Sequence, residues 1–105
     1  MIVSYLIRRT DSNQKELVAK FRSLGASVAI TSGLGHGIPD IVIGLRGRMA
    51  WVEIKDGKKA LSQQKLTPDE QKFHSEWHGM VYIIRSEEEA EQLVRKLKND
   101  SKQVP

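Results

Sequence analysis

The chain has 105 residues, of which 39% are hydrophobic, and its 17 basic and 13 acidic residues give a net charge of +4. This length suits one compact domain, expected to span residues 1–105 with its core at about 11–98, and leaves no room for a second. The absence of cysteine excludes disulfides, thiolate zinc sites and a cysteine nucleophile.

The sequence predicts neither a membrane span nor a secretory signal. Its apolar stretches are far shorter than the ~20 residues needed to cross a bilayer. The Arg8-Arg9 pair follows the first apolar run, whereas the charges of a secretory signal precede it. We therefore expect no membrane partner and a cytoplasmic protein, of a bacterium or of a phage-infected host cell.

The first element predicted along the chain is a helix. Asp11 and Gln14 have the spacing of a capping box. A helical stripe of apolar residues follows at positions 17–24, and Gly25 ends it. Residues 1–7 fit either an extra edge strand or part of a subunit interface.

A strand and a glycine-rich loop come next. Residues 26–31 favour a strand, and residues 32–37 read Ser-Gly-Leu-Gly-His-Gly. This loop lacks the Gly-Lys-Ser/Thr ending of a Walker loop. Its glycines are expected to let the backbone turn sharply and approach a phosphate.

Residues 40–45 and 48–54 predict two antiparallel strands joined by the turn Arg46-Gly47. A two-residue loop fixes the pairing and puts Asp40 opposite Glu53, with paired Cβ atoms about 4.5–5.5 Å apart. Because side chains alternate between the faces of a sheet, Lys55 shares the face of these two acids. The other face collects the apolar residues Ile41, Ile43, Ala50, Val52 and Ile54. A bulge in either strand would shift this register by one residue.

The chemistry of these residues indicates a metal site. Two neighbouring carboxylates repel and raise each other's pKa, and a divalent cation between them reverses that penalty. Asp40, Glu53 and the backbone carbonyl of Ile54 supply the oxygen ligands that suit Mg²⁺ or Mn²⁺. Lys55 then holds the attacking water and offsets charge on a phosphate. The pattern predicts a metal-dependent phosphodiesterase site at the rim of the sheet.

A second helix begins with a clear signal. Thr67 fits the N-cap, Pro68 the N1 position and Glu70 the capping box. Phe73 and Trp77, four residues apart, predict its core face.

Polar residues of this helix form a neighbouring stripe. Gln71 and His74 lie three residues apart, so Gln71 is placed to reach the metal waters or Lys55 and His74 to approach DNA. His74 and His78 also have the spacing of a zinc pair, but no H-E-x-x-H motif and no cysteine accompany them, and we reject that reading.

The chain is expected to end with a strand, a helix and a tail. Residues 80–84 favour a fourth strand, and Ser86 with Glu89 caps a last helix that runs through Leu97. Residues 99–105 are polar and are expected to fray.

These motifs together resemble the PD-(D/E)xK nuclease signature. They are Glu16 on the first helix, Gly-x-Pro-Asp at 37–40, Glu-Ile-Lys at 53–55 and Gln71 on the second helix. More specifically, residues 14–84 resemble the small stand-alone members of the virus-type replication-repair nuclease (VRR-NUC) family. The resemblance implies an α/β fold with an αβββαβ core, here followed by an extra helix. It also implies Mg²⁺- or Mn²⁺-dependent hydrolysis of DNA phosphodiesters and likeness to Holliday-junction resolvases, which act as homodimers.

The resemblance also assigns roles to residues. It makes Asp40 and Glu53 the metal-binding pair, Lys55 the catalytic lysine and Gln71 the helix glutamine. Glu16 becomes a helix acid that assists through a second metal ion or a water, although an exposed Glu in a first helical turn is also ordinary dipole chemistry.

Basic and loop residues near these motifs predict a DNA-binding surface. The basic cluster lies in the hairpin turn and after the third strand: Arg46, Arg48, Lys55, Lys58, Lys59 and Lys65. Lys58 and Lys59 are the expected phosphate contacts, against the alternative of simple exposure. In the glycine-rich loop, Gly35 and His36 are DNA-binding candidates, with exposure an equal alternative for His36. Ser32 stands near the place where junction resolvases carry a serine.

The sequence therefore predicts an endonuclease that acts on branched DNA. One chain of this size carries a single site, and a four-way junction is resolved by paired incisions, so a two-fold homodimer is expected. Two alternatives stay open. One is a nuclease of the same chemistry that acts on flaps, nicked duplex or general DNA, and the other is a non-enzymatic basic DNA-binding module.

Overall fold

The computed structural model describes residues 13–103, with side chains for residues 13–100. Its elements are α1 (Gln14–Ser23), β1 (Ser27–Ile30), β2 (Ile41–Leu45), β3 (Arg48–Ile54), the 3-10 turn η2 (Leu61–Gln63), α2 (Pro68–Glu76), β4 (Val81–Ile84) and α3 (Glu87–Gln103). This order confirms the predicted α/β fold with its additional C-terminal helix. The predicted cap at Asp11 and the segment 1–7 lie outside the described residues.

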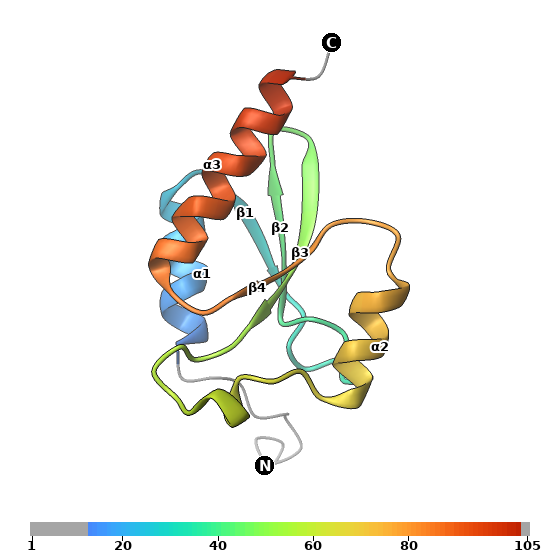
Figure 1. Ribbon diagram of the computed structural model, residues 1–105. Coiled ribbons are helices and arrows are strands. Elements are labelled where there is room, and N and C mark those ends of the chain that lie inside the picture. The colour runs from blue at the N-terminus through green and yellow to red at the C-terminus, as the bar shows by residue number, and fades with distance from the viewer. Residues whose placement is uncertain (1–12, 104–105) are drawn as a thin grey trace, which may run out of the picture.

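The four strands form one mixed sheet in the order β1-β2-β3-β4. The pairs β1–β2 and β2–β3 are antiparallel, and β4 runs parallel to β3. A parallel pair needs a long crossover connection, which the segment containing α2 supplies. Helices α1 and α3 lie together on one side of the sheet and α2 lies on the other (Figure 1).

The hairpin β2–β3 has the predicted register. Arg46 and Gly47 both have positive φ, 52° and 78°, as the two central residues of a type I′ turn require. Ile41 pairs with Val52, and Ile43 pairs with Ala50. Continued outward by one residue, this register sets Asp40 opposite Glu53.

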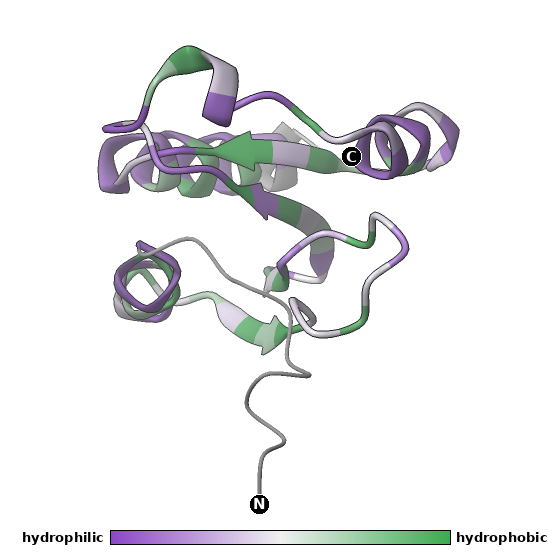
Figure 2. Cartoon of the chain, turned by 90° about the horizontal axis from the view of Figure 1, so that it is seen from below, coloured by the Kyte–Doolittle hydropathy of each residue, from purple (hydrophilic) through white to green (hydrophobic). Residues whose placement is uncertain are grey.

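The sheet face under α1 and α3 holds the apolar core. Alternate residues of β2 and β3 contribute, and each of these apolar side chains is at most 8% exposed. The buried set is Ile41, Ile43, Leu45, Ala50, Val52 and Ile54 from the hairpin, Leu17, Val18 and Phe21 from α1, Ile84 from β4, and Ala90, Leu93, Val94 and Leu97 from α3. Figure 2 shows the hydrophobic residues concentrated in the strands and the hydrophilic ones on the helices. This arrangement confirms the predicted apolar face.

The face under α2 is covered by aromatic rings. Phe73 and Trp77 stack on each other at 5.2 Å between ring centroids, and each meets Trp51 of β3 edge-on, at 5.4 and 5.5 Å. No residue of α2 is fully buried, however, and Trp77 is 45% exposed. The prediction that Phe73 and Trp77 form a core face was therefore wrong: they cap the edge of a polar site.

Helix α3 is longer than the sequence indicated. Its cap is the predicted one, with the Ser86 hydroxyl accepting the Glu89 amide at 3.2 Å. The helix continues to Gln103, so residues 99–103 are helical and not a frayed tail. Among residues 13–103, no helix has both the length and the apolar content needed to cross a membrane.

Candidate active site

Asp40 is fixed by the chain that surrounds it. Thr31, directly after β1, donates its amide to the Asp40 carbonyl at 2.8 Å and its hydroxyl to the Pro39 carbonyl at 2.7 Å. The Asp40 carboxylate in turn accepts the backbone N–H of Ile54 at 2.7 Å. This bond draws the carboxylate across to β3 and places it beside Glu53.

Glu53 is a buried acid with an incompletely satisfied carboxyl group. Its side chain is only 3% exposed. Burial raises the pKa of Glu53 to about 10, and the hydrogen bond with Asp40 and the charge of that residue add to the effect. The Glu53 carboxyl group is therefore protonated at neutral pH and bonded to Asp40. Its Oε1 atom is buried and has no hydrogen-bond partner among the described residues.

Lys55 lies on the same face, one pleat beyond Glu53, and forms a buried ion pair. Its Nζ is 2.9 Å from Oε1 of Glu70, and the two side chains are 10% and 13% exposed. Burial raises the pKa of Glu70, but hydrogen bonds from Lys55 and from the Thr67 amide outweigh it and hold that pKa below its usual range. Glu70 is therefore ionised and pairs with the charged lysine.

His74 completes the cluster from the next turn of α2. Its Nε2 lies 3.8 Å from Oε1 of Glu53, too far for a hydrogen bond. Burial lowers the pKa of His74, so its imidazole is neutral at pH 7. Like Oε1 of Glu53, this Nε2 is buried and has no hydrogen-bond partner within the described part of the chain.

The oxygen atoms of this site fit a divalent cation. Within the described residues, no three His, Cys, Asp or Glu side chains converge in a metal-binding group. Asp40 and Glu53 are two carboxyl groups that lie together at this rim of the sheet. The Ile54 amide faces Asp40, and because the N–H and C=O of one strand residue point the same way, the Ile54 carbonyl faces that side too. Mg²⁺ typically takes one or two carboxylates and keeps several waters. The unpartnered Oε1 of Glu53 offers such an ion a free ligand.

A solved VRR-NUC domain has a similar structure. The two superpose with a TM-score of 0.61 and share 27% sequence identity over 78% of this chain and 89% of that chain. The chain has a VRR-NUC nuclease fold. The resemblance to this family seen in the sequence motifs is thereby confirmed. No protein-family model and no curated protein matches the sequence.

Two of the residues assigned by the VRR-NUC resemblance lie away from the acid pair. Gln71 is exposed and donates to the Leu66 carbonyl at 3.2 Å, so the expectation that it reaches Lys55 was wrong. Glu70, its neighbour in the chain, has that contact. Glu16 is exposed on α1, which packs on the opposite face of the sheet from Asp40. Glu16 lines a separate hollow of about 840 Å³, so the structure does not bring it to the metal ligands as predicted.

Residues of the glycine-rich loop differ in their surroundings: Ser32 contacts α1, His36 is exposed and Gly37 packs on α2. Ser32 accepts a hydrogen bond from Gln14 of α1 at 3.1 Å, which gives it a structural contact. His36 is exposed and has a positive φ of 59°, next to Gly35 at 76°. Gly37 packs so closely on the first turn of α2 that a Cβ added there would overlap the Asp69 carbonyl. The loop and the start of α2 therefore form one unit beside the site.

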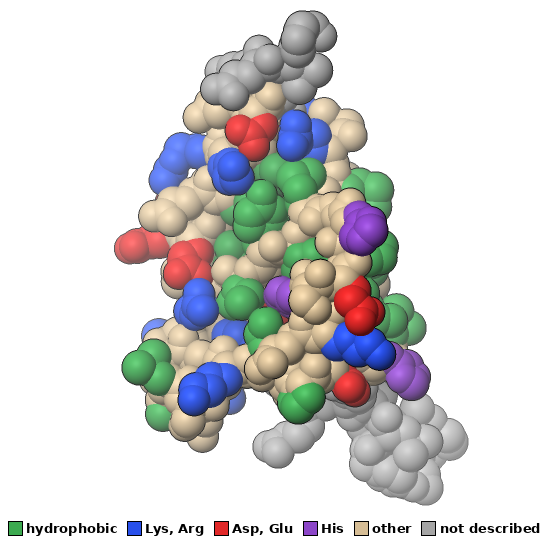
Figure 3. Space-filling view, turned by 45° about the vertical axis from the view of Figure 1, so that its right-hand side comes forward, with side chains coloured by type: hydrophobic (Ala, Val, Ile, Leu, Met, Phe, Trp, Pro, Cys, Tyr) green, Lys and Arg blue, Asp and Glu red, His purple; other side chains and the backbone are tan. Residues whose placement is uncertain are grey.

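The two lysines after β3 are on the surface. Lys58 and Lys59 are both exposed in the turn that follows Lys55, and Lys58 lines the same hollow as Glu16. The exposed positions of Lys58 and Lys59 suit contact with a phosphate backbone. Other basic and apolar side chains are exposed on the side of the molecule that Figure 3 shows.

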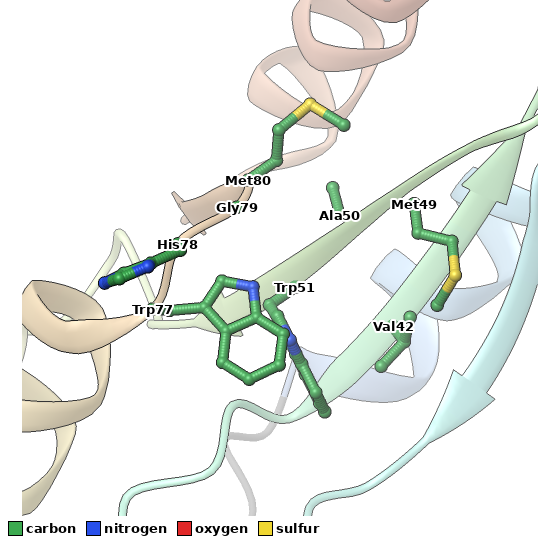
Figure 4. A pocket seen from close by; sticks show the side chains of 8 residues that line it. All are labelled: Val42, Met49, Ala50, Trp51, Trp77, His78, Gly79 and Met80. Atoms are coloured by element: carbon green, nitrogen blue, oxygen red, sulfur yellow. The ribbon is translucent and has the colours of Figure 1, made fainter.

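An apolar groove of about 390 Å³ adjoins the charged cluster. Trp51 and Trp77 lie close together at one end of it, and Met49 and Met80 approach from β3 and from the segment before β4 (Figure 4). Met49 is 67% exposed. The groove lies on the α2 face, two residues along β3 from Glu53.

Sequence reasoning missed the part that Glu70 takes in the site. Its position at N3 of α2 identified it as a capping residue, and the capping box is present in the structure. A second function for a capping glutamate has no local sequence signal. The one clue in the sequence was the charge of Lys55. This lysine was predicted on a sheet face that α2 must cover, so an acidic residue of α2 was needed to pair with it.

Proposed function

We propose that this protein is a Mg²⁺- or Mn²⁺-dependent DNA endonuclease whose active site is built on Asp40, Glu53 and Lys55. The observation that carries this proposal is the placement of the half-buried Asp40 carboxylate, held by the Ile54 amide, beside the buried Glu53 and Lys55 at the rim of the sheet. Burying Glu53 beside a second acid is costly, and a fold that needed only stability would have apolar residues there. The VRR-NUC fold supports the same conclusion.

Each residue has a distinct task in this proposal. Asp40, oriented by the Ile54 amide, and Glu53 hold the cation together with the Ile54 carbonyl. When bound, a divalent cation supplies positive charge at the phosphate and acidifies water. Glu53 would hold the cation as a carboxylate and release its proton to solvent on binding, because its raised pKa is caused by burial and by the neighbouring Asp40.

Lys55 supplies the remaining charge. Its ammonium group orients the water that attacks phosphorus and stabilises the negative charge that develops as the phosphoester bond breaks. Lys58 and Lys59, exposed directly after it, hold the DNA backbone by contacts that do not depend on sequence.

The proposed substrate is branched DNA, cut by a homodimer. The single Asp40–Glu53–Lys55 site among the described residues motivates this, since symmetric incision of a four-way junction needs two sites. A nuclease with the same chemistry that acts on flaps or nicked duplex is the second candidate.

The test is cleavage of labelled four-way junction, flap, nicked duplex and linear duplex DNA with Mg²⁺, Mn²⁺ or EDTA. We expect cleavage with either metal and none with EDTA, and faster cleavage of the junction than of linear duplex. Asp40→Asn is the matched variant, because an asparagine oxygen can still accept the Ile54 amide. Binding of DNA with no cleavage under any of these conditions would favour the non-enzymatic module instead.

A further inference from the structure

The Glu70 carboxylate joins two parts of the molecule through a single oxygen atom. Oε1 accepts the backbone amide of Thr67 at 2.9 Å, which closes the capping box of α2. The same atom accepts Nζ of Lys55 at 2.9 Å. The start of helix α2 and the end of strand β3 are therefore tied together at the proposed catalytic lysine.

We propose that Glu70 is a positioning residue, which holds the Lys55 ammonium group in place for the reaction. This inference rests on the proposed function, since it concerns the proposed catalytic lysine. It gives Glu70 the contact with Lys55 that helical spacing suggested for Gln71.

A lysine at this position needs such a partner. Its side chain is a flexible four-carbon stem with a compact charge at the end, so the strand alone does not fix where the ammonium group lies. A displacement of about 1 Å in a reacting group can lower a rate by about 10²-fold. The ion pair with Glu70 is 10% and 13% exposed at its two side chains, so solvent screens it little.

The element that carries Glu70 is itself held in place. Thr67 caps α2 and accepts the Glu70 amide at 3.2 Å. Phe73 and Trp77 pack the helix against Trp51 of β3, and Gly37 of the glycine-rich loop lies against its first turn. Glu70 is thus anchored at its backbone and at its carboxylate, and it presents a fixed charge to Lys55.

A purely structural reading of Glu70 makes a different prediction. Glutamine serves in a capping box as well as glutamate does, so a residue that only caps α2 tolerates Glu70→Gln without loss of function. A residue that positions a charged lysine does not, because the substitution keeps the shape and removes the charge. The variant Glu70→Gln therefore separates the two readings.

The experiment compares four variants with the wild type in steady-state cleavage of the best DNA substrate, with Mn²⁺ varied. For Glu70→Gln we expect kcat to fall about 10²-fold, with little change in KM and in the Mn²⁺ concentration at half-maximal rate. Asp69→Asn, which removes an exposed carboxylate from the same helical turn, is expected to match the wild type. Lys55→Ala is expected to lower kcat to a small residual rate that long incubations still measure, and the double variant Lys55→Ala/Glu70→Gln to keep that same rate, because residues that act as a unit are not additive.

Three results would overturn the inference. One is a Glu70→Gln variant with the kcat of Asp69→Asn, and another is a further loss in the double variant, which would give Glu70 a role apart from Lys55. A large rise in the Mn²⁺ requirement of Glu70→Gln would make Glu70 a metal ligand. In each case the wild type still cleaves DNA far faster than Lys55→Ala, so the proposed function stands. A wild-type protein that cleaves none of the DNA substrates removes both proposals together.

Discussion

The two faces of the central sheet are built on opposite principles. On the α1 and α3 side, alternate strand residues such as Ile41 and Val52 are 0% exposed and meet only apolar partners of the core. On the α2 side, the sequence neighbours of these apolar residues are Asp40, Glu53 and Lys55. Glu53 is 2% exposed and Lys55 is 8% exposed.

The comparison teaches where stability and function reside. Apolar burial is the main stabilising force in folding, so the α1 and α3 face supplies most of it. The α2 face buries ionisable groups and leaves Glu53 Oε1 and His74 Nε2 without hydrogen-bond partners among the described residues, which opposes folding. Substitutions on the two faces should therefore have separable effects.

The largest effect is expected for Asp40→Asn. Loss of a metal-binding charge should lower the cleavage rate by about 10³-fold or more, equal to about 4 kcal/mol in the activation barrier. Because asparagine keeps an acceptor for the Ile54 amide, the free energy of unfolding should stay within about 1 kcal/mol of the wild type. Cleavage kinetics and urea denaturation measure the two quantities. An active Asp40→Asn variant would remove Asp40 from the proposed metal site.

The opposite pattern is expected for Phe21→Ala on the other face. Phe21 is 0% exposed, and truncation of a buried Phe costs about 3–5 kcal/mol of unfolding free energy. Folded protein that remains should cleave DNA at nearly the wild-type rate per active site, because Phe21 lies in the apolar core on the face of the sheet opposite the proposed site. Urea denaturation, with activity normalised to the folded fraction, tests this. A normal stability would contradict the assignment of the core.

A glycine pair tests the contact between the loop and α2. Gly37 and Gly47 have φ of 77° and 78°, so alanine at either position carries a backbone penalty of about 1–2 kcal/mol. At Gly37 the added Cβ would also overlap the Asp69 carbonyl, whereas nothing lies within 4 Å of a Cβ at Gly47. Gly37→Ala should be the more destabilising by about 1–3 kcal/mol, and it alone should slow cleavage. Equal effects would show that the loop does not support α2.

Measured per pH unit, the smallest effect is the pH dependence of stability caused by Glu53. Its pKa is raised from the model-peptide value of 4.5 to about 10, so between these values the folded state binds a proton that the unfolded state has released. Stability in EDTA therefore falls as pH rises through this window, by up to about 1.4 kcal/mol per pH unit. Glu53→Gln cannot ionise and should gain stability over the wild type from pH 5.5 to pH 9. A stability difference that does not change with pH would show that the pKa is not raised.

Elements set by local rules were predictable from the sequence. The Arg46-Gly47 turn fixed the hairpin register, because a two-residue loop allows one pairing. Thr67, Pro68 and Glu70 marked the start of α2 correctly, since capping depends on neighbouring residues alone. The convergence of Asp40 and Glu53 follows from that register.

Features set by tertiary packing were not predictable in the same way. Gln71 and Glu70 differ by about 100° around a helix, and only the packing of Phe73 and Trp77 on Trp51 decides which of them faces Lys55. Glu16 lies on α1, and the buried apolar stripe of this helix decides on which face of the sheet the helix packs. A motif resemblance gives residue types but not the directions in which side chains point. The expected contact of Gln71 with Lys55 and the expected approach of Glu16 to Asp40 and Glu53 were therefore both wrong.

The most direct test of the account is a crystal structure of the wild-type protein with Mn²⁺, with the ion located by its anomalous scattering. We expect a peak about 2.0–2.3 Å from carboxylate oxygens of both Asp40 and Glu53, with the Ile54 carbonyl and waters completing the shell. A peak in the hollow lined by Glu16, or none between Asp40 and Glu53 at a saturating concentration of Mn²⁺, would contradict the central claim.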